Sequence, residues 1–106
     1  MRGEAMTINF AKLVKTKKDS ELIERANTLV GTIRLNTTEL LWHLREIEVR
    51  RLFIELGYSS MHQYGMKHLK LSEGEFQRRI SAARLLTELP EIEEQIKDGE
   101  LNLTNL

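Results

Sequence analysis

Apolar residues recur along this chain every three or four positions, which is the period of an amphipathic helix, and strand-like alternation is almost absent. The first stripe follows Ser20, a suitable N-cap, and fades near Asn36. It consists of Leu22, Ile23, Ala26, Leu29, Val30 and Ile33. The pattern predicts an all-α fold of about five helices, with residues 1–19 as a basic N-terminal arm and residues 20–106 as a single domain.

The longest predicted helix begins at Thr37 or Thr38 as its N-cap and ends at Gly57, a residue type favoured just past a helix end. Glu48, Arg51 and Glu55 are spaced to form ion pairs along it. Its apolar residues form two stripes, so we expect the helix to be central and covered from two directions. One stripe comprises Leu41, Trp42, Val49, Leu52, Phe53 and Leu56, and the other Leu40, Leu44, Ile47 and Ile54.

Two helix starts follow in quick succession. Ser60 with Gln63 and Ser72 with Glu75 both match the spacing of a capping box. A short helix ending near Lys70, a tight turn and a longer helix over residues 73–88 make a helix-turn-helix-like unit at about residues 60–88.

The second helix of this unit carries the candidate site. Phe76, Ile80 and Ala83 form one apolar side, and Ala82, Leu85 and Leu86 form a second apolar strip. Polar side chains lie between the strips and suit phosphate and base-edge contacts in a DNA major groove. The alternative is a solvated face without a ligand. The candidate nucleic-acid-binding residues are Gln77, Arg78, Arg79, Ser81 and Arg84, with Lys67 and Lys70 before them and Lys15, Lys17 and Lys18 as further phosphate contacts.

Leu89-Pro90 ends that helix, and a last helix begins at the proline with Ile92 and Ile96 on one face. Its glutamates lie at the positive N-terminal end of the helix, so they need no cation to explain them. Gly99 is expected to end it, and Thr104 resembles an N-cap at the end of the sequence.

Composition restricts the function further. The 106 residues include no cysteine, equal numbers of acidic and basic groups, and no apolar run long enough to cross a bilayer. The N-terminus lacks the features of a secretory signal, so we expect a cytoplasmic protein. Residues 61–87 nevertheless carry five basic and two acidic groups, whereas residues 88–106 carry one lysine and six acids. A zero net charge therefore does not argue against nucleic-acid binding.

No catalytic, metal-binding or cofactor-binding motif is evident. The three histidines, His43, His62 and His68, lie in predicted helices without a ligand set beside them. We expect each to be a polar or partly packed side chain. No phosphate loop or nucleophile motif occurs, and no small-molecule substrate is indicated.

Residues 40–106 resemble the helical region that precedes the nuclease domain in a group of bacterial HNH endonuclease-type proteins. The upstream run "LLWHLREIEVRRLFIEL" also fits this likeness. The resemblance implies a helical module, whereas the HNH site itself, a ββα element with a metal and a histidine base, is absent from this sequence. The matching positions are Gly57, Tyr58, Ser60, Tyr64, Leu69, Leu71 to Gly74, Arg78 to Ile80, Ala82 to Leu85, Pro90, Gly99, Leu101, Leu103, Thr104 and Leu106.

A looser likeness extends to the helix-turn-helix of ParB-type partition proteins. A serine after the turn, the dipeptide Leu89-Pro90 and an acidic helix carry this likeness. Lys70 stands where that family usually has the turn glycine, and the stretch from Phe76 to Pro90 is about one helical turn longer than theirs.

Three hypotheses follow. The first is a non-catalytic module that binds or positions DNA, either a natural short relative or a portion of a longer nuclease. The second is a protein-interaction module or homodimer, because the stripe from Leu22 to Ile33 and the strip of Ala82, Leu85 and Leu86 exceed what one small core covers. The third, an HNH nuclease activity of this chain, rests only on the resemblance.

Overall fold

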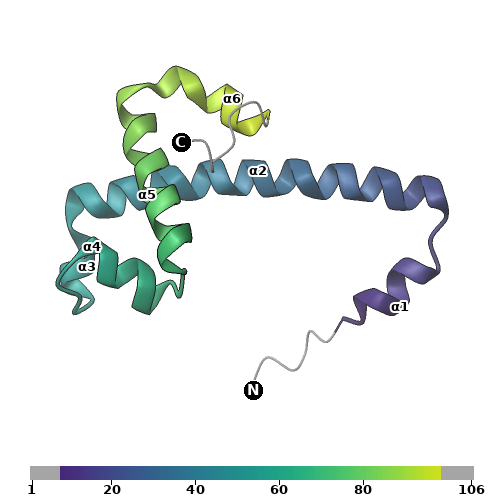
Figure 1. The fold of residues 1–106 in the computed structure, drawn as a ribbon, viewed down its shortest axis with the longest axis horizontal. Helices are drawn as coiled ribbons and strands as arrows, with labels where there is room; N and C mark the ends of the chain where they lie inside the picture. The colour runs from purple at the N-terminus through teal and green to yellow at the C-terminus, as the bar shows by residue number, and fades with distance from the viewer. Residues whose placement is uncertain (1–7, 99–106) are drawn as a thin grey trace. The chain divides into compact units, whose positions relative to one another are not determined.

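The computed structural model describes residues 8–98, and every regular element in that range is helical, which confirms the all-α fold. By contacts between residues, the chain divides into two compact units, with the boundary between Val30 and Gly31. No helix of the described range is long and apolar enough to cross a membrane. The elements are α1 (Phe10–Lys15), α2 (Asp19–Arg50), α3 (Leu52–Glu55), α4 (Met61–Gln63), the π-helical segment η2 (Tyr64–His68), α5 (Glu73–Glu88), the 3-10 turn η3 (Pro90–Ile92) and α6 (Glu93–Lys97) (Figure 1).

Helix α2 is continuous from Asp19 to Arg50, so the predicted break near Asn36 is wrong. Thr38, expected to cap a new helix, instead donates its hydroxyl to the carbonyl of Arg34 at 3.0 Å. A threonine hydroxyl satisfied by the carbonyl four residues earlier fits inside a helix. No proline interrupts the chain here, so the two predicted helices join into one.

Helix α2 begins at Asp19, two residues before the start expected from Ser20 as the N-cap. Ser20 lies inside the first turn and does not cap the helix. Glu21 instead accepts a hydrogen bond from the backbone N–H of Lys18 at 2.9 Å, as the glutamate of a capping box does. Within the predicted basic arm, α1 begins at the N-cap Asn9, whose side chain accepts from the N–H of Lys12.

Arg51 separates α2 from α3 by taking a left-handed backbone conformation, with φ of 55°. The chain turns at this residue, and Phe53 becomes the one buried side chain of α3. Gly57, with φ of 94°, follows α3 as expected for a helix end, a conformation that glycine adopts at little cost. The long predicted helix is therefore interrupted once before its predicted end.

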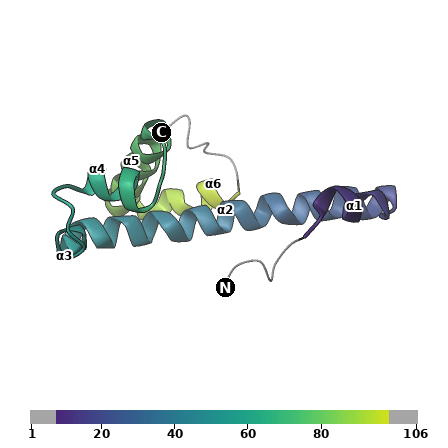
Figure 2. The same ribbon diagram turned by 90° about the horizontal axis from the view of Figure 1, so that it is seen from below.

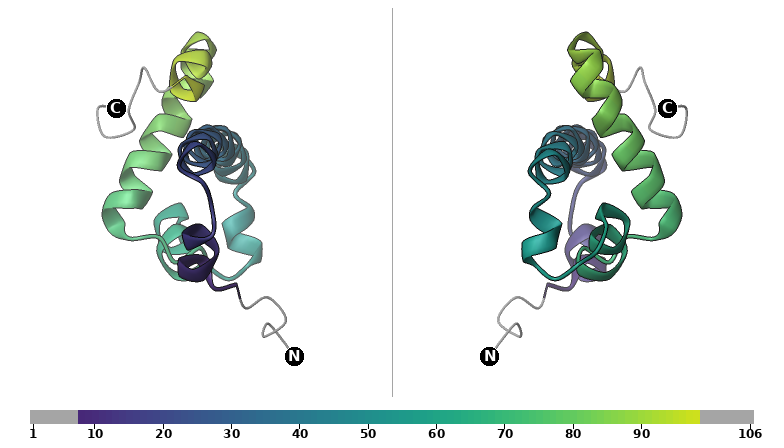
Figure 3. Two further views of the ribbon diagram at one scale, coloured as in Figure 1. Left: turned by 90° about the vertical axis from the view of Figure 1, so that its right-hand side faces the viewer. Right: turned by 90° about the vertical axis from the view of Figure 1, so that its left-hand side faces the viewer.

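The hydrophobic core lies entirely in the unit that begins at Gly31. Figures 1 and 2 show α5 crossing the C-terminal part of α2, and Figure 3 shows α3 and α5 on opposite sides of α2 with α4 and η2 between their far ends. These elements enclose the buried side chains. They are Leu41, Leu44, Phe53, Met61, Tyr64, Phe76, Ile80, Ala82, Ala83, Leu86 and Ile96.

This core corrects two expectations. Ala82 and Leu86 are fully buried, so the second apolar strip of α5 is not surplus surface. The two apolar stripes of the segment from Thr38 to Gly57 are both covered only in part, since Leu41 of one and Leu44 of the other are fully buried. The exposed apolar side chains of this segment include Trp42, Val49, Ile54 and Leu56.

Ser60 begins α4 by accepting the N–H of Gln63 at 3.0 Å, which confirms its predicted role as an N-cap. The Gln63 side chain reaches Ser59 instead of returning to Ser60, so the predicted capping box is only half formed. Segment η2 continues the helix, and the N–H of Leu69 bonds to the carbonyl of Tyr64, five residues earlier.

Gly65 in η2 lies directly against the ring of Phe76 on α5. A Cβ atom placed on Gly65 would lie 2.2 Å from Cδ1 and 2.5 Å from Cε1 of the Phe76 ring. Both residues are buried. Only glycine leaves room for the ring, so the contact sets how closely α5 lies against η2.

The last helix is fastened to α2 by a hydrogen bond from the indole N–H of Trp42 to a carboxylate oxygen of Glu93. Ile96 is buried and Ile92 half-buried, as the pattern predicted, and Pro90 opens the turn η3. The predicted helix end at Gly99 and the cap-like Thr104 lie outside the described residues.

We expect Gly65→Ala to lower the free energy of unfolding by about 1–3 kcal/mol, because the added methyl group overlaps the ring of Phe76. Urea denaturation followed by far-UV circular dichroism measures the change. Gly31→Ala is the matched control, since nothing lies within 4 Å of its added Cβ, and alanine favours a helix. Equal stability of the two variants would contradict the close contact.

Candidate nucleic-acid interface

Helix α5 begins with the complete capping box predicted from Ser72 and Glu75. The hydroxyl of Ser72 accepts the N–H of Glu75 at 3.1 Å, and a carboxylate oxygen of Glu75 accepts the N–H of Ser72 at 2.9 Å. The hydrogen bond from the backbone N–H of Ser72 is the main cause that lowers the pKa of Glu75, and the side chain of Ser72 lowers it further. The box fixes the start of α5, and hence the direction in which each later side chain points.

The turn before α5 depends on Lys70, which has a φ of 61°. The N–H of Leu71 bonds back to the carbonyl of Gly65 at 3.0 Å. A left-handed residue followed by a hydrogen bond back to the helix resembles a Schellman motif. Here the hydrogen bond spans one residue more than in that motif, because η2 is a π-helix. Position 70 therefore has the geometry that favours glycine, although its residue is lysine.

Three candidate residues form an exposed row on the N-terminal half of α5. Gln77, Arg78 and Ser81 are all exposed. Ser81 follows Arg78 by three residues and Gln77 by four, so the three side chains lie on one face of the helix. Lys67 and Lys70 are exposed on the segment before α5. Within residues 8–98, no carboxylate lies within ion-pair distance of Arg78, Lys67 or Lys70.

Arg79 lies at the edge of this row. Its side chain is half-buried, and its Nη1 lies 3.7 Å from a carboxylate oxygen of Glu75, one turn earlier. The Nε of Arg79 is buried without a hydrogen-bond partner in the described residues. The Arg79 guanidinium is thus directed along α5 toward Glu75.

Arg84 is held by α2. Its Nε donates to Glu48 at 3.2 Å, and its Nη2 forms a second hydrogen bond with the other carboxylate oxygen. Arg45 also donates to Glu48, at 2.8 Å. The hydrogen bond from Arg84 is the main cause that lowers the pKa of Glu48; burial opposes it, and Arg45 lowers this pKa further. In return, the hydrogen bond to Glu48 raises the pKa of Arg84. The bidentate pair fastens α5 to α2.

Sequence reasoning missed this pair because its two residues are 36 positions apart. The predicted ion-pair row of Glu48, Arg51 and Glu55 is wrong, because Arg51 leaves the helical conformation and Glu48 bonds to Arg45 and Arg84. The exposed fraction of the Glu48 side chain is only 17%, which is low for a carboxylate and consistent with its two arginine partners.

The histidines have local contacts. The ring of His68 stacks on Tyr64 with a centroid distance of 5.2 Å, and its Nδ1 lies 3.3 Å from the hydroxyl of Tyr58. His62 meets the ring of Phe76 edge to face. The Nδ1 of His43 lies 2.8 Å from the carbonyl of Glu39. In the described part of the chain, no three acidic or histidine side chains are grouped closely enough to hold a metal ion.

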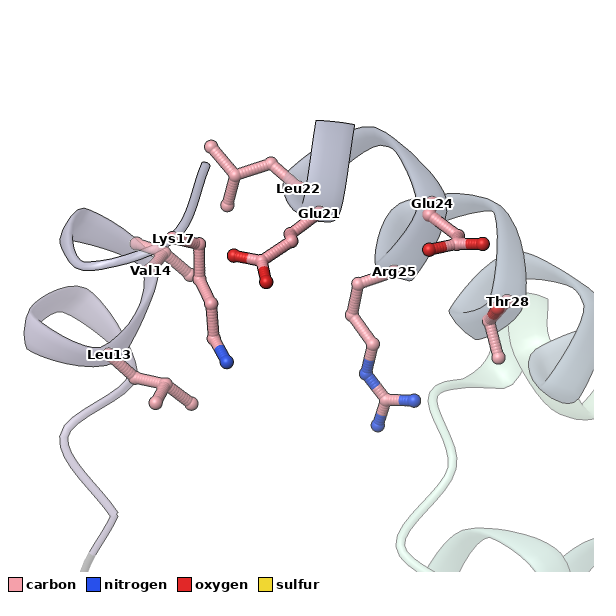
Figure 4. Close-up of a pocket in the computed structure, with 8 residues that line it drawn as sticks. All are labelled: Leu13, Val14, Lys17, Glu21, Leu22, Glu24, Arg25 and Thr28. Atoms are coloured by element: carbon pink, nitrogen blue, oxygen red, sulfur yellow. The ribbon is translucent and has the colours of Figure 1, made fainter. Parts of the chain in front are cut away.

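A separate hollow of about 410 Å³ lies between α1 and the first turns of α2 (Figure 4). Leu13 and Val14 of α1 and Leu22 of α2 give it an apolar lining, while Lys17, Glu21, Glu24 and Arg25 bring charges of both signs to its rim. Such balanced charge does not favour an anionic or a cationic ligand. The hollow contains none of the α5 residues.

No protein-family model, no curated protein and no solved structure matches this chain.

We expect Glu48→Gln to lower the free energy of unfolding by about 1–2 kcal/mol near neutral pH, because it removes the charge that Arg84 and Arg45 share. Folding lowers the pKa of Glu48 below its ordinary value of 4.5. Its carboxylate therefore stabilises the fold at pH values above 4.5, and this stabilisation is lost as the pH falls through the pKa that Glu48 has in the folded protein. The difference between the parent protein and the variant should therefore shrink in acid, as measured by urea denaturation at several pH values.

Glu46→Gln serves as the control, because Glu46 pairs with Arg50 where both side chains are more than half exposed. It should change stability by no more than about 0.5 kcal/mol. A Glu48→Gln variant as stable as this control at neutral pH would contradict the role given to the Glu48–Arg84 pair.

We expect Lys70→Gly to be more stable than Lys70→Ala by about 0.5–1 kcal/mol, because only glycine adopts a φ of 61° without steric cost. Both variants lose the same positive charge, so the comparison isolates the backbone effect. Thermal denaturation of the pair measures it, and an alanine variant at least as stable as the glycine variant would contradict the left-handed turn.

Proposed function

We propose that this chain binds double-stranded DNA through the exposed row of α5 and the turn that precedes it, without a catalytic step of its own. The observation that carries the proposal is the position of Arg78 between Gln77 and Ser81, all exposed near the start of a helix that follows a tight turn. In helix-turn-helix proteins, the N-terminal residues of the second helix reach base edges in the major groove.

Each side chain in the row suits a part of that contact. The guanidinium of Arg78 can bond to two acceptors of a guanine or to a phosphate. Gln77 can pair with an adenine, and the hydroxyl of Ser81 can donate to a base or a phosphate. Lys67 and Lys70, both exposed, supply phosphate contacts that fix the position of the helix.

The local charge supports the proposal more weakly than the arginine count suggests. Arg79 pairs with Glu75 and Arg84 with Glu48, so among the candidate residues around α5 only Arg78, Lys67 and Lys70 have no carboxylate of the described residues within ion-pair distance. Few phosphate contacts imply weak binding with a shallow salt dependence. The resemblance to the helical region of HNH endonuclease-type proteins suggests that the module positions DNA for a separate catalytic domain.

We expect fluorescence anisotropy of a labelled duplex to rise with protein at low salt, and the affinity to fall as salt increases. Arg78→Ala should weaken binding roughly tenfold, because it removes a bidentate contact to a base or phosphate. Its stability should remain unchanged, since the side chain is exposed. The Arg84→Ala change is less informative, because it also removes a partner of Glu48.

Arg50→Ala is the matched control, since it removes an exposed arginine from α2 and not from α5. It should bind the duplex nearly as well as the parent protein. A flat anisotropy at low salt, or an equal loss of binding in Arg78→Ala and Arg50→Ala, would reject α5 as the DNA-binding surface.

A further inference from the structure

The N-terminal part of α2 displays an apolar stripe that the described residues do not cover. No residue of α2 before Thr38 is buried. The exposed fraction of the side chain is 38% at Leu22 and 61% at Ile33, and the values at Leu29 and Val30 lie between these two. Helix α1 supplies Leu13 and Val14 near Leu22, but the hollow between them stays open. This stripe, from Leu22 to Ile33, is called the α2 stripe below.

A helical segment of this kind gains little stability by itself. Most helical stability in proteins comes from packing an apolar face, and the part of α2 before Thr38 buries none of its residues. No residue of the α2 stripe is buried in the described residues, so a contact with another surface would add to the stability of this part of α2.

The spacing of the α2 stripe matches a coiled coil. Residues 22, 26, 29, 33, 36 and 40 follow one another at alternating intervals of four and three residues, the heptad spacing of a helix–helix seam. Beside this seam, Ile23 and Val30 widen the apolar face on one flank. A second helix of similar character fits this face.

The charges on the other flank of the seam favour an antiparallel arrangement. Lys18 and Arg25 lie on this flank near the start of α2, and Glu39 and Glu46 lie on it farther along, at intervals of seven, fourteen and seven residues. A second copy running in the opposite direction would bring the basic part of one helix beside the acidic part of the other. A parallel copy would leave the basic and the acidic groups about four helical turns apart, since Arg25 and Glu39 are 14 residues apart.

One register satisfies both the apolar and the charged positions. When Leu29 packs against the partner's Ile33, Arg25 lies opposite the partner's Glu39, and Val30 meets the partner's Val30 at the two-fold axis. In a two-fold interface, each contact of one copy is repeated by the other, so the two surfaces must be complementary to themselves. This register meets that condition. It pairs the other seam positions as Leu22 with the partner's Leu40, Ala26 with the partner's Asn36, and Asp19 with the partner's His43. Lys18 lies near the partner's Glu46, which also pairs with Arg50 of its own chain.

The surface of α2 is open where this register places the partner's helix. A depression of about 280 Å³ is lined by Asn36, Glu39, Leu40 and His43. These are the positions that would receive the first turns of the partner's α2, including the partner's Leu22. Among residues 8–98, neither Arg25 nor Glu39 has an ion-pair partner within its own chain.

We propose that two copies of this chain form an antiparallel dimer along α2, with the α2 stripe at its centre and Arg25 of each copy paired with Glu39 of the other. This inference rests on α2 and does not depend on DNA binding by α5. The two are compatible, because helix-turn-helix proteins often read paired half-sites as dimers.

Sedimentation equilibrium over a range of protein concentrations tests the dimer. The parent protein should associate, and Ile33→Asp should abolish association by placing a charge in the seam. Leu35→Asp is the matched control, because Leu35 is exposed to a similar extent, 56%, but lies on the opposite side of α2. A parent protein that stays monomeric at every concentration would overturn the proposal and leave the α2 stripe for a different occupant.

Charge reversal tests the direction of the helices. Arg25→Glu and Glu39→Arg should each raise the dimer dissociation constant about tenfold, because each creates two like-charge pairs across the axis. Combining the two substitutions should restore association, since each pair is attractive again. A dimer that both single changes leave intact, or that the double change fails to restore, would refute the antiparallel register.

Discussion

A single small core governs the whole arrangement. In the described residues, every buried apolar side chain lies between Leu41 and Ile96, and the C-terminal part of α2 and helices α3 to α6 all contribute to it. Burial of Ile80 and Leu86 fixes which face of α5 remains in water. The same core does not reach the first part of α2. Both proposed contacts, the DNA-facing row and the α2 stripe, are therefore surfaces that this core leaves exposed.

The three arginines of α5 show why a count of charges overstates what a helix offers to a ligand. Arg84 bonds to Glu48 on α2 and helps to hold the two helices together. Arg79 is directed toward Glu75 within α5. Arg78 alone of the three lies free of carboxylates in the described residues. The proposed DNA contact depends on this division, since an arginine that already pairs with a half-buried carboxylate gains less from a phosphate.

Local signals in the sequence predicted local structure well. The capping box of Ser72 and Glu75 and the proline that opens η3 are determined by residues only a few positions apart, and both occur as expected. The candidate row of Gln77, Arg78 and Ser81 followed from helical spacing, and the structure places it on the exposed face. Its function is a separate question that the fold does not answer.

Features that depend on distant residues could not be predicted in the same way. Thr38 looks like a cap in sequence, but its hydroxyl bonds to Arg34 inside a continuous helix. The left-handed turn at Arg51 has no residue signal, because arginine does not favour that conformation. The Gly65–Phe76 contact and the Glu48–Arg84 pair join segments that only the folded chain brings together.

The central claim is that α5 and α2 present two separate binding surfaces, one for DNA and one for a second copy of the chain. Amide hydrogen exchange at residue resolution, with and without a short DNA duplex, tests this most directly. We expect slow exchange across residues 22–33 in the protein alone, and protection gained on adding DNA in residues 67–81. Rapid exchange across residues 22–33, or protection by DNA there and not in residues 67–81, would contradict it.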